Sequence, residues 1–196
     1  LKLAQRERAL ARGIRQMTWT FDPLQGRNAH LNFARLGVTS DDYRLDYYGD
    51  VSTSPLHTAT GTDRLWVTWQ LDSERVLGRI AGRGEGASQR GRPLGAKCFD
   101  AARLVVVGED GAPRVAGAVA DAAGRPAVIE IPGEIGVLQR RDPALASEWR
   151  RVTRSAFVAA LEAGYAVEEF LRVMRYGAAA GSYLLRRRDE GGKARQ

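Results

Sequence analysis

The side chains best able to do acid–base chemistry in this chain are few. His57 lies in a polar loop, and its ordinary imidazole pKa near 6.5 suits a general base, although a solvated loop histidine gives the same pattern. His30 lies in a predicted helix, where a surface or satisfied polar role is the competing interpretation. Asp22 ends a predicted strand, and its carboxylate either binds an ammonium group or caps the turn that Asp-Pro favours. The residues alone leave each pair of alternatives open.

Proton donors and nucleophiles are equally sparse. Tyr47 and Tyr48 lie on a predicted strand over residues 43–48 and are candidates for a general acid, with cross-strand packing as the alternative. Cys98, the single cysteine, precedes Phe99 and a hydrophobic run, which favours a small buried residue over a nucleophile. One cysteine also excludes an internal disulfide and a zinc site built on several cysteines, so no metal is expected.

The elements that must position these side chains are strands and helices in a mixed order. Apolar and polar residues alternate at 64–71, which makes this the clearest strand, and Asp142-Pro143 is a typical helix start. The predicted strands are 15–21, 43–48, 64–71, 102–107, 114–119, 127–131, 166–173 and 182–186, and the predicted helices are 1–13, 27–36 and 142–163. We expect an α/β (α+β) fold with a mixed, mostly antiparallel sheet and flanking helices, in which residues 102–131 form an antiparallel meander.

Glycine and arginine dominate residues 82–97, which predicts a long loop or linker. The chain is then divided into a first portion, 1–81, and a second α+β portion, 98–188. Residues 189–196 are expected to be a disordered tail.

Three short strings give the first portion a resemblance to a known family. TWTFDPL at 18–24, RNAHLN at 27–32 and TDRL at 62–65 resemble a bacterial branch of the GNAT superfamily of N-acyltransferases. The strand, the break at Asp-Pro and the helix ending in Leu-Gly also follow the later half of that domain. The family pattern is matched by Ala29, Leu36, Gly37 and Val38. The resemblance covers roughly residues 1–71 well and the remainder loosely.

The resemblance implies a GNAT-like sheet that lacks its first strands. It also implies transfer of an acetyl or succinyl group, from acetyl-CoA or succinyl-CoA, to the amine of an amino-acid-like acceptor held for direct attack on the thioester. We expect the family's pyrophosphate loop to lie ahead of Leu1, in a segment this sequence does not include. Residues 79–84 satisfy the loop's letters, Arg-x-x-Gly-x-Gly, but no predicted strand precedes them and no helix follows.

The same resemblance suggests cofactor contacts on the helix over 27–36. Asn28 and Asn32, one turn apart, are expected to meet the amides of the pantetheine arm, and Arg27 and Arg35 to neutralise phosphates. Capping by Asn28 and simple exposure of the others explain these residues equally well.

For catalysis the chain departs from the family. The tyrosine that protonates the departing CoA thiolate is replaced by Phe33, so Tyr48 becomes the candidate acid, with Asp22 and His57 as acceptor-binding candidates. A groove wide enough for CoA is expected between the Trp19 strand and the strand after it.

The net charge of the chain limits the classes of binding partner but does not identify one. The 30 Lys and Arg outnumber the 23 Asp and Glu, giving a net charge of +7, which suits a nucleic acid, an anionic membrane or coenzyme A but also an arginine-rich composition. No basic run carries interleaved aromatic residues, so a basic nucleic-acid binder is the less favoured of the alternative functions. No apolar run spans a bilayer, which favours the cytoplasm and no membrane partner. The alternative function is a non-catalytic remnant or partner-binding domain, with a homodimer as one way to cover the open sheet edge.

Overall fold

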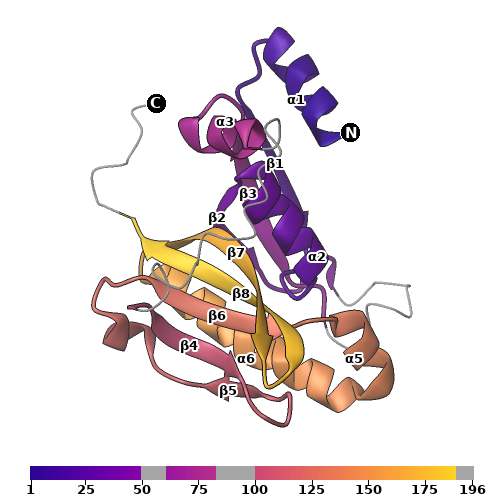
Figure 1. The fold of residues 1–196 in the computed structure, drawn as a ribbon, viewed down its shortest axis with the longest axis vertical. Helices are drawn as coiled ribbons and strands as arrows, with labels where there is room; N and C mark the ends of the chain where they lie inside the picture. The colour runs from indigo at the N-terminus through magenta and orange to yellow at the C-terminus, as the bar shows by residue number, and fades with distance from the viewer. Residues whose placement is uncertain (50–60, 83–99, 189–196) are drawn as a thin grey trace.

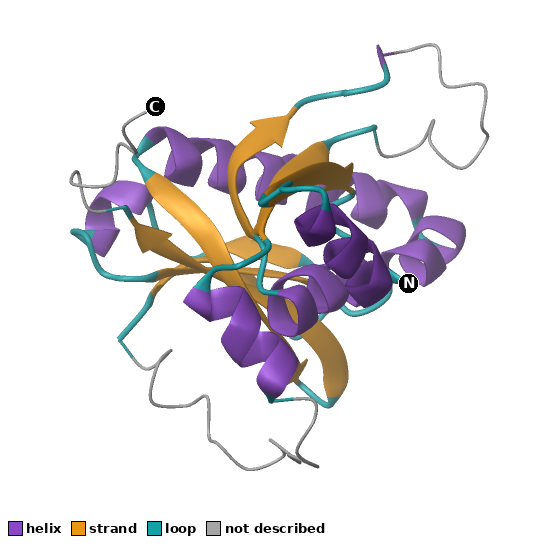
Figure 2. Cartoon of the chain, turned by 90° about the horizontal axis from the view of Figure 1, so that it is seen from above, coloured by secondary structure: helices purple, strands orange, loops and turns teal. Residues whose placement is uncertain are grey.

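The computed structural model describes residues 1–49, 61–82 and 100–188 (Figure 1). The elements in chain order are α1 (Lys2–Ala11), β1 (Gln16–Phe21), α2 (Gly26–Ala29), η1 (His30–Leu36), β2 (Thr39–Arg44), β3 (Arg64–Gln70), α3 (Glu74–Ala81), β4 (Ala102–Val107), β5 (Pro113–Val115), η3 (Val119–Ala122), β6 (Ala127–Pro132), α5 (Ile135–Arg141), α6 (Pro143–Glu162), β7 (Tyr165–Arg175) and β8 (Ala178–Arg187). The expected mixed α/β class is confirmed. Seen from above, helices lie against the strands on more than one side (Figure 2).

The described strands form one eight-stranded sheet in the order β1-β3-β2-β7-β8-β6-β4-β5. Every neighbouring pair is antiparallel except β4 and β6. The predicted meander is therefore wrong. β5 returns beside β4 but stops at Val115, and the chain then passes through η3 before it re-enters the sheet as β6, parallel to β4. A parallel neighbour requires such a crossover connection.

Backbone pairing between neighbouring strands is sparsest where strands of the two predicted portions meet. β2 and β7 share one ladder pair, Ser40 with Val167, whereas β7 and β8 pair along almost their whole length. Tyr183 of β8 fills the space beside this junction. Its ring meets Phe33 of η1, Phe157 of α6 and Phe170 of β7 at centroid distances of 5.8, 5.1 and 4.8 Å. Aromatic packing thus joins the two parts of the sheet where backbone pairing is sparse.

Local sequence signals explain several elements directly. On β3, alternation buries Leu65, Val67 and Trp69, and the Trp69 indole donates to the carbonyl of Leu36 at 2.8 Å. At the start of α6 the Asp142 carboxylate accepts the backbone N–H of Leu145 at 2.9 Å, as the predicted N-cap requires.

The strand predicted over 43–48 is shifted. β2 covers 39–44, and the chain then turns, with Asp46 at φ 40° and the Tyr47 N–H bonded to the Thr62 carbonyl. The pattern of residues 43–48 predicts a strand that runs to residue 48, but Asp46, at positive φ, ends the ladder before that point. Helices α3 and α5 were not predicted. Among the described residues no helix is both long enough and apolar enough to cross a membrane.

Candidate functional site

The segment that carries the sequence-predicted site begins where β1 ends. The Asp22 carboxylate accepts the backbone N–H of Leu24 at 2.9 Å, which fixes the turn at Asp22-Pro23 before α2 starts at Gly26. From His30 the helix continues as the π-helix η1, in which hydrogen bonds run from residue i to i+5. It ends at Gly37, whose φ of +75° is the left-handed conformation that favours glycine.

The two asparagines differ in burial. Asn28 lies in α2 and Asn32 in η1. Asn28 is exposed, whereas Asn32 is buried at 4% exposure. The expected pair of amides on one ligand-facing surface is therefore wrong.

The first turn of α2 forms one wall of a cleft of about 420 Å³. Gly26 and Arg27 face the turn at Gly133 and Glu134 that follows β6, and the floor is the hairpin of β7 and β8. The residues that line it are Gly26, Arg27, Gly133, Glu134, Phe170, Arg172, Val173, Met174, Ala179, Ala180 and Gly181. A volume of this size is in the range of small-molecule sites.

Small residues leave the cleft unfilled and allow the elements around it to pack closely. A Cβ added to Gly181 would lie 2.4 Å from the Phe170 ring, and one added to Gly133 would lie 2.3 Å from the carbonyl oxygen of Ala179. Neither position tolerates a side chain without displacement of its neighbour. The run Ala178–Gly181 therefore forms a stretch of strand whose side chains are all very small. This run of small residues is the sequence signal that indicates the cleft.

Three charged side chains surround the cleft. Arg27 and Glu134 form an ion pair across it at 3.0 Å, with side chains 80% and 54% exposed, so this pair contributes little to stability. Arg172 comes from β7 and is exposed. Of these three, only Arg27 was predicted. Arg172 and Glu134 were missed because an isolated charge on a strand or turn has no local signature.

Near these arginines lies His30, half-buried. Burial first, and then the positive charges of Arg172 and Arg35, lower the pKa of its imidazole below the ordinary value. The Nδ1 atom is buried and has no hydrogen-bond partner among the described residues. His30 is therefore held neutral at neutral pH.

We expect this histidine to make the fold acid-sensitive. Below about pH 6.5 the unfolded chain takes up a proton at His30 that the folded chain resists, so the free energy of unfolding falls as pH drops through the folded-state pKa. Urea denaturation of the wild type and His30→Asn from pH 7.5 to 5 measures it. The wild type should lose more stability than H30N across this window, and parallel curves would contradict the prediction. His57 is present in both proteins and cancels from the difference.

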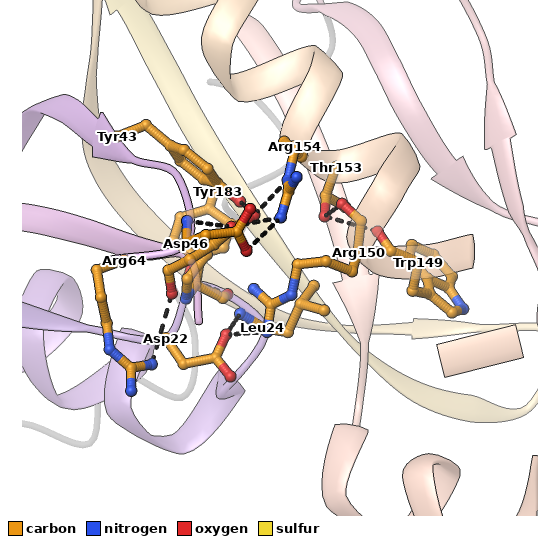
Figure 3. Close-up of polar contacts among 12 residues, drawn as sticks. Asp22, Leu24, Tyr43, Asp46, Arg64, Trp149, Arg150, Thr153, Arg154 and Tyr183 are labelled. Carbon is orange, nitrogen blue, oxygen red and sulfur yellow. Dashed lines mark hydrogen bonds and ion pairs between the residues drawn. The ribbon is translucent and has the colours of Figure 1, made fainter. Parts of the chain in front are cut away.

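Asp22 is engaged in a buried polar network rather than open to a ligand. Its carboxylate pairs with Arg150 of α6 at 2.7 Å, and the Arg150 side chain is only 4% exposed (Figure 3). The structure thus gives Asp22 the turn-capping role and an ion pair.

The same face of α6 reaches a second carboxylate. Arg154 donates to Asp63 from Nε at 2.8 Å and from Nη2 at 2.6 Å, and it also pairs with Asp46 at 3.0 Å. The Tyr43 hydroxyl donates to Asp63 at 2.7 Å, and burial together with the Asp63 charge raises the pKa of Tyr43 well above its usual value. This network links the first three strands to α6. None of its residues is among those that line the cleft.

Tyr48, the candidate acid, lies away from the cleft. It is 55% exposed, its ring packs edge-on against Tyr47 at 5.0 Å, and the Arg64 guanidinium lies 5.1 Å from the ring centroid. The structure therefore gives it the packing role rather than contact with the cleft-lining residues.

Several sequence predictions fall outside the described residues: His57, Cys98, the linker over 82–97 apart from Gly82, and the tail over 189–196. In the loop-like string at 79–84, Arg79 to Ala81 form the last residues of α3 instead of a turn ahead of a helix. Arg79 lies 3.6 Å from Glu169.

The groove expected between the Trp19 strand and the strand after it is not formed by the described strands. β3 lies between β1 and β2 and forms ladders with both, so these strands are not separated by open space. That expectation is wrong. The outer edge of β1, however, has no neighbouring strand within the described part of the chain.

Comparison with models of protein families, with curated proteins and with solved structures found no match. Within residues 1–49, 61–82 and 100–188, no group of three or more His, Cys, Asp or Glu side chains is arranged to hold a metal ion.

Proposed function

We propose that this chain is an acyl-CoA-dependent N-acyltransferase that moves an acetyl or succinyl group to the amine of an amino-acid-like acceptor. Two things support the proposal: the resemblance of residues 1–71 to the GNAT superfamily, and a charged cleft at the start of the helix that the resemblance associates with the cofactor. The cleft is the observation that carries it.

The donor is proposed to lie along the outer edge of β1. Backbone N–H and C=O groups on this edge face away from β3, and they can pair with the amides of a pantetheine arm as they would with an added strand. The edge runs toward Asp22, and residues 22–25 then lead to the first turn of α2. A thioester bound in this way would present its carbonyl near the start of the helix.

The acceptor is proposed to occupy the cleft. Phe170 and Met174 offer apolar surface, while Arg27, Arg172 and Glu134 supply both signs of charge, a combination that fits a zwitterion with an apolar side chain. The free amine attacks the thioester carbonyl carbon, a C–N bond forms, the C–S bond breaks, and CoA leaves as its thiolate. The ammonium proton is released to solvent before attack, and the second proton, which the nitrogen loses as the amide forms, neutralises the departing thiolate. Proximity supplies most of the rate gain.

Calorimetric titration of acetyl-CoA and succinyl-CoA tests this proposal. The titration uses this chain. Binding, followed by appearance of free thiol when an amino acid is added, is the expected result. Absence of binding would overturn the proposal and favour the partner-binding alternative. A cytoplasmic location is part of the proposal, because the single cysteine suits a reducing compartment.

A further inference from the structure

We infer that Arg172 anchors a ligand carboxylate in the cleft, and that the low floor made by Ala179 and Gly181 sets the size of the apolar chain attached to it. This inference rests on the proposed function, which it deepens by assigning substrate recognition to particular residues. The ligand class is a small carboxylate that carries an apolar chain.

The position of Arg172 follows from the register of the hairpin. Arg172 pairs with Gly181, and Met174 pairs with Ala179, so these residues point to the same side of the sheet. Phe170, two residues before Arg172, also lies on that side. All of them line the cleft. The guanidinium therefore rises from a floor of small residues between two apolar side chains.

Of the two arginines that line the cleft, Arg172 is the one whose charge can bind a ligand without first breaking an ion pair of the described residues. Arg27 is paired with Glu134 at 3.0 Å, whereas Arg172 makes no ion pair within the described ranges. The nearby Arg175 is directed to the other side of the strand, where its Nε donates to the buried Glu130 at 2.7 Å. An exposed guanidinium beside apolar surface suits a carboxylate, because its planar N–H groups bind both oxygens.

Two molecules of the proposed reaction carry such a carboxylate. One is the acceptor amino acid, through its α-carboxylate, and the other is a succinyl donor, through the carboxylate at the far end of its acyl chain. The chemistry at Arg172 is the same for both, so the experiment must distinguish them.

The test compares Arg172→Met with Arg187→Met, an exposed arginine at the far end of the neighbouring strand β8. The probes are L-leucine, 3-methylbutylamine, which is leucine without its carboxylate, and succinate. Each is titrated into the protein without acyl-CoA, and KM values are measured with acetyl-CoA and with succinyl-CoA. Circular dichroism and the urea midpoint of each variant show that the fold is retained.

If the acceptor is the source, R172M weakens leucine binding about tenfold or more, leaves 3-methylbutylamine unchanged, and raises the KM of leucine with either donor. If the donor is the source, R172M weakens succinate binding and raises the KM of succinyl-CoA but not of acetyl-CoA. Either result supports the inference, provided that R187M behaves as wild type. Equal effects of R172M and R187M, or no binding of leucine or succinate to the unmodified protein, would overturn it.

Ala179→Leu tests the floor. The added side chain should weaken leucine binding more than alanine binding, because it fills the volume that the longer chain needs. Equal weakening of both would contradict the assigned role.

Failure of this inference can be told apart from failure of the proposed function. Acyl transfer that is insensitive to R172M retains the acyltransferase and removes the anchor. Leucine binding that R172M abolishes, in a protein that transfers no acyl group, retains the anchor and removes the transferase.

Discussion

Replacing Arg154 by methionine is expected to lower the free energy of unfolding by about 3–5 kcal/mol. Asp63 is fully buried and accepts two hydrogen bonds from Arg154, at 2.8 and 2.6 Å. Methionine keeps the apolar length of the side chain but removes the cation, which leaves a buried carboxylate with hydrogen bonds from Tyr43 and from the backbone N–H of Asp46 as its remaining support. Urea denaturation at pH 7 measures the loss.

Arg151→Met is the matched control because it lies on the same helix. Arg151 pairs with Glu148 in solvent, with side chains 68% and 42% exposed, so its removal should cost about 1 kcal/mol or less. If R154M does not fold at all, the double variant Asp63→Asn with Arg154→Met should recover stability, since the unpaired buried carboxylate at position 63 is removed. Equal losses for R154M and R151M would show that the buried pair does not hold α6 to the first strands.

Tyr183→Ala is expected to cost a similar amount, about 3–5 kcal/mol. The side chain is fully buried where β2 meets β7, it packs against three phenylalanine rings, and its hydroxyl donates to the Pro23 carbonyl at 2.6 Å. Truncation leaves a cavity at the junction that has only one ladder pair. Thermal and urea unfolding of the variant measure the effect.

Tyr176→Ala provides the comparison, because this tyrosine is 65% exposed at the tip of the same hairpin. It should change stability by less than about 0.5 kcal/mol. Tyr183→Phe separates the two contributions of the buried ring: it retains the packing and should lose about 1–3 kcal/mol for the unpaired Pro23 carbonyl. A Tyr183→Ala variant as stable as Tyr176→Ala would refute the role of Tyr183 at the junction.

The parts of the fold that the sequence predicts well are those fixed by nearby residues. Asp142-Pro143 starts α6 because the cap and the first-turn proline act within three residues, and alternation along 64–71 specifies which face of β3 is buried. The parallel arrangement of β4 and β6 depends on the path of the chain through η3. The residues of the two strands do not by themselves indicate that arrangement. Partner choice between strands is a property of the whole sheet.

For the candidate site too, the sequence predicts what depends on nearby residues and not what depends on distant ones. Arg27 could be named because it stands beside a recognisable helix start, and Asp22 because Asp-Pro marks a turn. Their actual partners, Glu134 and Arg150, lie 107 and 128 positions along the chain and could not be assigned from local pattern. Helical spacing does not predict that Asn32 is buried while Asn28 is exposed, because burial depends on which elements pack against the helix.

The long separations in the polar network affect the order in which the chain can fold. Asp63 and Arg154 are 91 positions apart, and Asp22 and Arg150 are 128 apart, so closure of these loops carries a large entropic cost before any bond forms. During synthesis, β1 and β3 leave the ribosome long before α6 does. Until that helix is made, the carboxylates of Asp22 and Asp63, the second of them fully buried in the folded protein, have no arginine partner from α6. Completion of the fold therefore waits for its last third, and slow refolding is the kinetic consequence.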